Sequence, residues 1–384
     1  MKKIKVTHIW KDFDTYNGMV EILLFIAKYH NRELFNLGAC VFNDHGGEHS
    51  RRFEELGGKV YNLNCGYGLR GHIKFLPRLK DFLLEQRPDI VVTHDRRANL
   101  FGILAANQAK IPVIISMETT LKDSATSRIK ILRDRALHPI LLLMVWSSDT
   151  FVCTSACIRR QWMRKSCLSK FRVFYPPFNL EKYNSVVSHP GNSDRSKAYP
   201  TLGYVGRLSE EKGLHYLIRA MARVCCRFPG VKLLVAGSGV MENSFKSLAK
   251  TEKVADAINF LGFQDNPFRI MEQIDLLILP SRTEGCPIVV IEAMAMGVPV
   301  IASNVGGVPE LVTNDVGTLV PPKDAEALAK SITNLLEQPE LMRKMGEAAH
   351  KRAFTYFQPL EFVRQFEKLY IELLEKKING KFMS

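Results

Sequence analysis

The chain has 384 residues, of which 46% are hydrophobic and 24% charged, a composition typical of a soluble globular protein. This length is too great for one compact core and predicts two α/β domains of ~150–200 residues each. No apolar run reaches the ~18–20 residues that a membrane-spanning helix needs, which argues against an integral membrane protein. His8, Lys11 and Asp12 interrupt the apolar stretch at the start, so it reads as a first strand and not as a signal peptide.

The net charge of +14 is unevenly distributed. Residues 1–178 carry 28 Lys/Arg against 16 Asp/Glu, and the remainder carries 25 against 23. Such asymmetry concerns partners and not fold, so the first half should attract a phosphate-bearing acceptor, a phospholipid surface or nucleic acid. A basic face that is merely solvated is the alternative. The eight cysteines form no CxxC pair and no zinc-finger spacing, so we expect free thiols in a reducing cytoplasm.

Strands and helices alternate along the first half. Helices are expected over 19–30, over 72–86, where Arg87-Pro88 ends the helix, and from about Asn99. Strands are expected at 3–10 (KIKVTHIW), 36–43 (NLGACVFN), 59–64 (KVYNLN), 89–94 (DIVVTH), 111–116 (IPVIIS) and 150–155 (TFVCTS), the last of this half. This alternation indicates βαβ units and a parallel sheet.

The polar segment 185–200 reads as a linker or surface loop, after which the same pattern starts again. Strands are expected at 201–206, 231–237, 258–263, 275–281, 299–303 and 317–321. Helices are expected at 214–228, 244–254, 268–274, 289–297, 325–338 and 359–378. The chain therefore predicts two Rossmann-like domains that face an interdomain cleft, with ligands outside the carboxyl ends of the strands.

The first motif runs from Gly203 to Gly213 (GYVGRLSEEKG), where a strand ends at Gly206 and Arg207 and Lys212 follow. Glycine lets the backbone approach a ligand closely. Arginine and lysine are the two usual phosphate binders, and a helix start beside them favours an anion. The alternative is a loop whose charges are solvated.

The second motif is Glu284 to Glu292 (EGCPIVVIE), in which two carboxylates bracket the start of a helix. Pro287 fits the first helical position, and the N–H groups of the residues after it form a seat for a pyrophosphate. Glu284 could then hydrogen-bond a sugar hydroxyl and Glu292 ribose hydroxyls. The alternative is one capping and one solvated carboxylate, although a glutamate among apolar residues needs a partner.

A third segment, 297–310, runs from a strand into a double glycine and a helix. Together the three motifs resemble the C-terminal half of the retaining nucleotide-sugar glycosyltransferases of family 4, the glycosyl transferases group 1, which have the GT-B fold. The resemblance is dense from about Tyr199 to Val320. It is looser over the first half, where VVTHDRRANLFGILAA, FVCTSACIRRQW and VFYPPFNLEKY match the family's pattern of elements.

The resemblance implies an acceptor-binding domain at 1–180, a linker at 181–200, a nucleotide-sugar domain at 201–357 and a helix at 358–384 that returns to the first domain. It also implies roles for individual residues. Arg207, Lys212 and Glu284 would be catalytic: the two cations would stabilise the leaving diphosphate, and Glu284 would contact the 3- or 4-hydroxyl of the donor sugar. The residues that would bind the rest of the donor are Gly18, Gly206, Gly262, Phe263, Gly285, Cys286, Pro287, Ile288, Val289 and Glu292.

No metal and no cofactor are expected, because such enzymes neutralise the diphosphate with arginine, lysine and a helix dipole; the expected donor is a UDP-sugar. On the acceptor side the candidates are His94 and Glu118. The chain departs from the family in two places: Asn17-Gly18-Met19 offers one glycine where two are common, and no histidine follows 111–116.

Between Lys122 and Arg172 there are eleven Lys/Arg and three Asp/Glu, and this segment either lies on an anionic membrane or packs as a core helix. We expect a cytoplasmic protein that transfers sugar to a carbohydrate or lipid-linked acceptor in polysaccharide or lipopolysaccharide synthesis. Peripheral contact with the inner face of the membrane is one option for its location, and a freely dissolved protein is the other. The alternatives are a nucleotide-sugar epimerase of related fold and a basic, non-enzymatic binding protein. A dehydrogenase is disfavoured, because no G-x-G-x-x-G follows the first strand, and nucleic-acid-binding motifs are absent.

Overall fold

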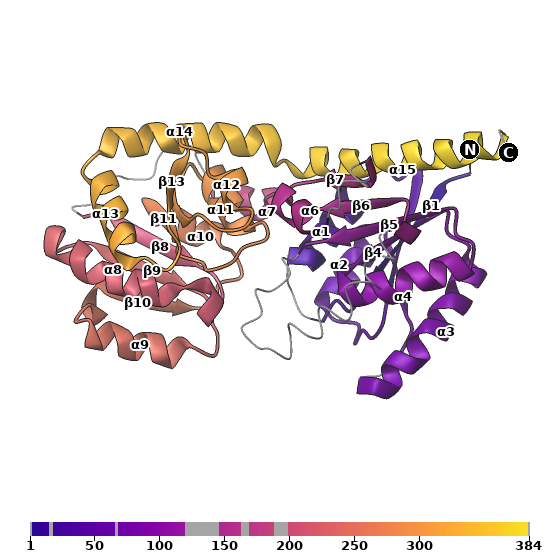
Figure 1. Ribbon diagram of the computed structural model, residues 1–384, viewed down its shortest axis with the longest axis horizontal. Coiled ribbons are helices and arrows are strands. Elements are labelled where there is room, and N and C mark those ends of the chain that lie inside the picture. Colours follow the sequence, from indigo (N-terminus) through magenta and orange to yellow (C-terminus); the bar gives the residue numbers. More distant parts are fainter. Residues whose placement is uncertain are drawn as a thin grey trace. The chain divides into compact units, whose positions relative to one another are not determined.

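The computed structural model describes residues 2–14, 18–65, 68–119, 146–162, 169–187 and 199–382. The chain forms two compact units (Figure 1). The first unit comprises Met1–Pro176 together with Pro359–Ser384, and the second comprises Pro177–Gln358. Each unit has its own parallel sheet, as the alternation of strands and helices predicts.

The first unit is built on a seven-stranded parallel sheet in the order β3-β2-β1-β4-β5-β6-β7. The order reverses between β1 and β4, where Val6 pairs with Ile90 and Ile9 with Thr93. The strands are β1 (Ile4–Trp10), β2 (Phe35–Val41), β3 (Lys59–Asn62), β4 (Ile90–His94), β5 (Val113–Glu118), β6 (Thr150–Cys153) and β7 (Phe171–Val173).

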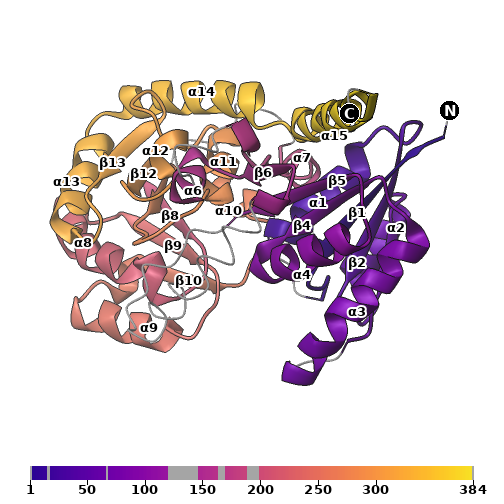
Figure 2. The same cartoon turned by 45° about the vertical axis from the view of Figure 1, so that its right-hand side comes forward.

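Helices cover both faces of the first sheet, because its strands are apolar on both sides. The helices α1 (Gly18–Tyr29), α2 (Glu48–Glu55) and α15 (Pro359–Phe382) share one core cluster with the sheet, and α3 (Gly68–Gln86) and α4 (Asp95–Gln108) share another. In Figure 1 and in Figure 2, α15 and α3 accordingly lie on opposite sides of the sheet. A short helix, α6 (Ala156–Trp162), connects β6 to β7.

Two predictions for the first unit are wrong in detail. The strand TFVCTS is not the last of this half, because β7 pairs with β6 and adds a three-residue edge strand. The helix expected from about Asn99 begins at Asp95, since His94 already has the extended backbone of an N-cap. Most of the basic segment between Lys122 and Arg172, and most of the predicted linker, lie outside the described residues.

The second unit is built on a six-stranded parallel sheet in the order β10-β9-β8-β11-β12-β13. Its order reverses between β8 and β11, where Leu202 pairs with Leu276. The strands are β8 (Thr201–Val205), β9 (Lys232–Ala236), β10 (Ile258–Gly262), β11 (Leu276–Leu279), β12 (Val300–Ser303) and β13 (Gly317–Val320).

One face of the second sheet packs on α8 (Leu214–Arg227), α9 (Glu242–Thr251) and α13 (Ala325–Leu336). The other packs on α11 (Ile288–Ala295), which contacts α10 (Phe268–Met271) and α14 (Pro339–Tyr356). The short helices are α7 (Leu180–Asn184) and α12 (Val308–Leu311), with 3-10 turns at Glu210–Lys212 and Ala255–Ala257. No helix in the described part of the chain combines the length and the apolar character needed to cross a membrane.

Candidate functional site

The candidate site lies in the second unit, where the strand order reverses between β8 and β11. The first motif continues from the carboxyl end of β8, and the second follows the carboxyl end of β11. Ligands of open parallel sheets bind at such a reversal point, because the loops from the two neighbouring strands diverge there. The sheet order therefore brings together two motifs that are about seventy residues apart in the sequence.

Lys212 and Glu284 form an ion pair at this point. Lys212 Nζ donates to Glu284 Oε1 at 2.8 Å, and Ser281 Oγ donates to the same oxygen at 2.7 Å. The Glu284 side chain is 7% exposed and the Lys212 side chain 23%. Both bonds fall on Oε1, so the geometry leaves Oε2 to accept a further hydrogen bond. The start of α11 has no side-chain cap in the described structure, so Glu284 is not the capping carboxylate of the alternative interpretation.

Local backbone structure holds the Lys212 loop against the end of β11. Gly213 has φ of +68°, and a Cβ there would lie 2.0 Å from the carbonyl oxygen of Pro280. The Arg282 N–H donates to the Glu211 carbonyl at 2.8 Å, and Arg282 also pairs with Glu210. Only glycine allows the Lys212 loop to approach the backbone after β11 this closely.

The predicted residues Gly206 and Arg207 follow β8, the predicted Gly262 ends β10, and Gly237 follows β9 between them. Arg207 is exposed, and its carbonyl accepts from the Tyr204 hydroxyl at 2.9 Å. The N–H of Gly206 donates to Ala236, and the N–H of Gly237 donates to the carbonyl of Gly262 at 2.7 Å. Phe263 comes directly after and is 68% exposed. The carboxyl ends of three strands thus form one edge with a cation and an exposed aromatic ring.

Helix α11 begins at Ile288, with Pro287 as its N-cap. The prediction that Pro287 is the first helical residue is wrong, because its ψ of 107° keeps the backbone extended. Val290 N–H donates to the Pro287 carbonyl, and no side chain among the described residues caps this helix start. Gly285 and Cys286 lead into the helix, and Val289 is its second residue. The start of α11 therefore still presents N–H groups to a ligand.

Glu292 and the third motif complete the arrangement. Glu292 lies on α11, one turn past its start, and is 7% exposed. The Gly307 N–H donates to the Glu284 carbonyl at 3.1 Å, so the double glycine of the third motif packs beside the second. Burial, followed by the carboxylates of Glu310 and Glu284, raises the pKa of the Cys286 thiol, which keeps it protonated.

The three candidates in the first unit lie at or after the ends of neighbouring strands, because His94 pairs with Met117, the residue before Glu118, and α1 follows β1. Gly18 is the first residue of α1. His94, at the end of β4, is fully buried, and its Nε2 lies 2.8 Å from Nδ1 of His8. Glu118 ends β5, is 1% exposed, and accepts from the Thr154 N–H at its carbonyl.

Sequence reasoning did not single out Ser281, Arg282 or His8 as contributing residues. Ser281 and Arg282 follow a fully buried strand in a parallel sheet, and that position is itself a signal of a ligand-facing loop. His8 gives a weaker signal, because a polar residue inside an apolar first strand has many explanations.

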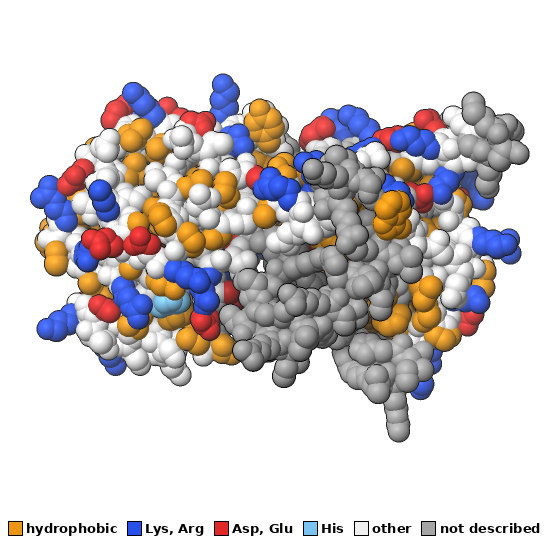
Figure 3. All heavy atoms as spheres, viewed as in Figure 1, with side chains coloured by type: hydrophobic (Ala, Val, Ile, Leu, Met, Phe, Trp, Pro, Cys, Tyr) orange, Lys and Arg blue, Asp and Glu red, His pale blue; other side chains and the backbone are white. Residues whose placement is uncertain are grey.

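Other surfaces of the second unit show different chemistry. On the face that Figure 3 draws, its Lys and Arg side chains lie among Asp and Glu side chains, as the near-balance of charge after residue 178 predicts.

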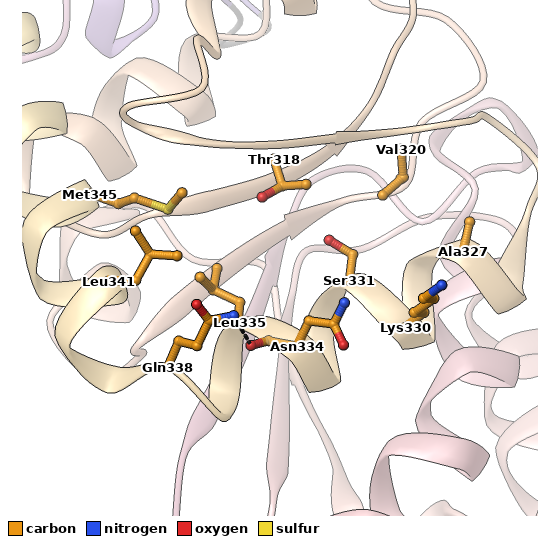
Figure 4. A pocket seen from close by; sticks show the side chains of 10 residues that line it. All are labelled: Thr318, Val320, Ala327, Lys330, Ser331, Asn334, Leu335, Gln338, Leu341 and Met345. Atoms are coloured by element: carbon orange, nitrogen blue, oxygen red, sulfur yellow. Dashed lines mark hydrogen bonds between the residues drawn. The ribbon is translucent and has the colours of Figure 1, made fainter.

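A pocket of about 310 Å³ lies between β13, α13 and α14, and Figure 4 shows Thr318 facing Ser331 and Asn334. None of the predicted site residues lines it, and its only charged residue is Lys330.

Comparisons with known proteins agree with these motifs. Residues 189–352 match the family model described as Glycosyl transferases group 1, and residues 23–170 match Glycosyl transferase 4-like domain. The chain is 27% identical to a glycogen synthase of Mycobacterium tuberculosis, over 71% of this chain and 66% of that protein, so it spans just under two thirds of that relative. It is 23% identical to the capsular polysaccharide biosynthesis glycosyltransferase CapM of Staphylococcus aureus, over 99% and 100% of the two chains.

Solved structures show the same fold. Sucrose-phosphate synthase from Thermosynechococcus elongatus superposes with a TM-score of 0.79 at 22% identity, over 97% of this chain and 100% of that one. The Anabaena protein HepE in complex with UDP superposes with a TM-score of 0.77 at 19% identity, over 97% of this chain and 100% of that one. The GT-B fold class expected from the sequence is confirmed, and the comparisons favour the predicted glycosyltransferase over an epimerase or a non-enzymatic binding protein. The chain therefore carries a glycosyl transferases group 1 domain at residues 189–352 and a glycosyl transferase 4-like domain at residues 23–170.

Proposed function

We propose that the chain is a retaining, metal-independent hexosyltransferase that uses a nucleotide-diphosphate sugar, with a UDP-sugar as the favoured donor. The observation that carries this proposal is the Lys212–Glu284 pair at the reversal point of the second sheet. The structural neighbour HepE is described in complex with UDP-glucose, which supports the choice of base. The proposed acceptor is a carbohydrate or lipid-linked glycan of a cell-surface polysaccharide or lipopolysaccharide, in keeping with relatives such as CapM.

In this proposal the cations of the site bind the leaving diphosphate, and its carboxylates bind the sugar and the ribose. An ammonium has three N–H donors, and Glu284 takes one of those of Lys212, so the others can meet the diphosphate. Arg207 adds a second cation, and the start of α11 adds a favourable field for an anion. Glu284 Oε2 would accept from a sugar hydroxyl, and Glu292 would hold the ribose.

The proposed reaction is attack from the same face that the diphosphate leaves. The acceptor oxygen forms its bond to the anomeric carbon while the bond from that carbon to the phosphate oxygen breaks, and the departing phosphate takes the acceptor proton. Catalysis then depends on positioning and on stabilising the negative charge of the diphosphate.

Substitution of the two cations tests this assignment. Arg207→Ala and Lys212→Ala should each lower turnover by about 10²–10³-fold, by analogy with the loss of one oxyanion donor. Lys246→Ala is the matched control, because Lys246 is an exposed cation of the same unit paired with Glu242. Near-normal turnover in both Arg207 and Lys212 variants would reject their role.

Binding of the donor is measured first, without an acceptor. A panel of nucleotide sugars should raise the melting temperature of the full chain, because a ligand of the native state stabilises it by mass action. The compound that raises the melting temperature most identifies the base and the sugar of the preferred donor. A panel without any shift would contradict the proposed donor class.

We further propose a location at the cytoplasmic side, with peripheral contact between the basic first half and an anionic membrane. The excess of Lys/Arg over Asp/Glu in residues 1–178 supports it. Co-sedimentation with anionic vesicles at low and high salt measures this contact, since screening weakens it. Absence of salt-sensitive binding would reject the membrane contact and leave the transferase proposal intact.

A further inference from the structure

The pocket between β13, α13 and α14 in the second unit is separate from the donor site. In the sheet, β12 lies between β13 and β11, and none of the donor candidates lines the pocket. Its volume of about 310 Å³ is at the lower end of the range of ~300–1,000 Å³ that small-molecule sites occupy. The pocket therefore has room for one small ring.

One wall of the pocket is polar. Ser331 and Asn334 lie on α13, and Thr318 faces them from β13 (Figure 4). In the described part of the chain, these three side chains make no hydrogen bond and no ion pair. Hydroxyl and primary amide groups both donate and accept hydrogen bonds. The wall thus offers unused donors and acceptors to a ligand.

The floor of the pocket is aliphatic and buried. Val320, Leu335 and Met345 line it and are 5%, 4% and 8% exposed. Their C–H surface favours contact with an apolar face of a ligand, because that contact removes both surfaces from water. A matching ligand therefore combines a C–H face with hydroxyl groups around its edge.

The charges around the pocket indicate a neutral ligand. Lys330 is the single charged side chain among the described residues that line it, and it is exposed. An anion would meet only this cation, whose attraction water screens. The described lining contains no acidic and no aromatic side chain, so a metal ion lacks carboxylate ligands and a nucleobase lacks a stacking partner.

We propose that this pocket binds one neutral sugar ring of a glycan, at a place separate from the transfer site. Sugar hydroxyls donate and accept, as the side chains of Thr318, Ser331 and Asn334 do, and the C–H face of the ring packs on the aliphatic floor. Asn334 and Gln338 are exposed, so the rest of the glycan extends into solvent. This binding does not depend on the proposed reaction.

The first experiment measures binding of neutral sugars to the full chain by saturation-transfer difference NMR. The probes are the methyl α-glycosides of glucose, galactose, mannose and N-acetylglucosamine. Ser331→Ala and Asn334→Ala should each raise Kd about fivefold, the effect of losing one hydrogen bond. Asn259→Ala is the matched control and should leave Kd unchanged, because Asn259 is an exposed asparagine on β10, at the opposite edge of the same sheet. A wild-type chain that binds none of the four glycosides overturns the proposal.

A second variant fills the pocket and does not depend on single hydrogen bonds. Ala327 is half-buried and lines the pocket from α13, where leucine is also a good helix former. Ala327→Leu should keep the melting temperature within about two degrees and weaken glycoside binding at least about tenfold. Wild-type signals in this variant would place the glycosides elsewhere on the chain, and would overturn the proposal.

Lys330 distinguishes a neutral ligand from an anionic one. Lys330→Gln removes the charge and keeps a hydrogen-bonding group, so it should change Kd for the glycosides by less than about twofold. Inorganic phosphate should not displace the glycosides from the wild-type chain. Displacement by phosphate that disappears in Lys330→Gln would identify an anion site and overturn the neutral sugar.

Transfer kinetics test whether the pocket is separate from the transfer site, with UDP-glucose as donor and octyl glucoside as acceptor. The double variant of Ser331→Ala and Asn334→Ala should keep turnover and both KM values within about twofold of wild type, since the two sites share no lining residue. A tenfold loss of turnover would assign these residues to the transfer site and overturn the separate role. A wild-type chain that binds no nucleotide sugar instead rejects the proposed function, and the glycoside titrations still decide this inference.

Discussion

At the residue scale, two fully buried histidines of the first unit, His8 and His94, link stability to pH. Burial, with a smaller contribution from His30, lowers the pKa of His8 to about 3, and burial also lowers that of His94. The unfolded chain binds protons near pH 6.5, whereas the folded chain does not. The free energy of unfolding is therefore not reduced by these histidines above pH 6.5, and it falls progressively between pH 6.5 and about pH 3.

We expect the free energy of unfolding to fall by about 2 kcal/mol per buried histidine between pH 7 and pH 5. Denaturant unfolding of the full chain at several pH values, followed by circular dichroism, measures this slope. His8→Asn removes one of the titrating groups, so its slope should be shallower than that of the wild type. Parallel slopes would contradict the assignment of a neutral His8 in the folded chain.

The residue types of the donor site could be predicted from the sequence, but their pairing could not. Arg207, Lys212 and Glu284 stand in motifs whose chemistry suits a diphosphate and a sugar. The bond between Lys212 and Glu284 depends on β8 lying beside β11, and that is a property of the whole sheet. For the same reason the sequence indicates that Ser281 lies in a ligand-facing loop, but not that it shares Oε1 of Glu284.

At the element scale, glycines let the strand ends of the second unit approach one another. Gly237 has φ of +141°, and a Cβ there would lie 1.9 Å from the carbonyl oxygen of Gly206. Gly262 has φ of +69° but nothing within 4 Å of its added Cβ. The two positions therefore separate the effect of a backbone clash from that of backbone conformation alone.

Gly237→Ala should lower the free energy of unfolding by more than 3 kcal/mol, because both the conformation and the clash oppose it. Gly262→Ala should lower it by about 1 kcal/mol, the cost of a left-handed backbone at alanine. The clash displaces Gly206 and with it Arg207, so we also expect Gly237→Ala to lose its thermal shift with the nucleotide sugar. Thermal melts with and without ligand measure both effects, and equal destabilisation would contradict the role of the clash.

Elements with a clear apolar period could be predicted, and those that pack small or few side chains could not. Helix α14 was not among the expected elements, because it buries only Met345, Gly346, Ala349 and Ala353. Gly346 lies against the carbonyl of Gly297, so close packing replaces large apolar side chains there. Strand β7 was missed because three residues are too few to show an alternation.

At the scale of the whole molecule, the chain leaves its first unit at Pro176 and returns to it at Pro359. Helix α15 carries Phe362, Phe366 and Tyr370 into the core of the first unit, where all three are buried. Phe366 is fully buried, and its ring lies 5.0 Å from that of Phe174. The last residues of the chain therefore stabilise a core that is otherwise formed by the first half.

Phe366→Ala should destabilise the first unit by about 3–5 kcal/mol, because truncation of a buried phenylalanine loses its transfer free energy and leaves a cavity. The second unit has its own core, so we expect calorimetry of this variant to resolve two transitions, with two-state behaviour lost. The lower transition reports the first unit. The upper one should rise with the nucleotide sugar as in the wild type, since every predicted donor residue except Gly18 lies within 177–358. A single transition that falls as a whole would instead show that the two units unfold as one.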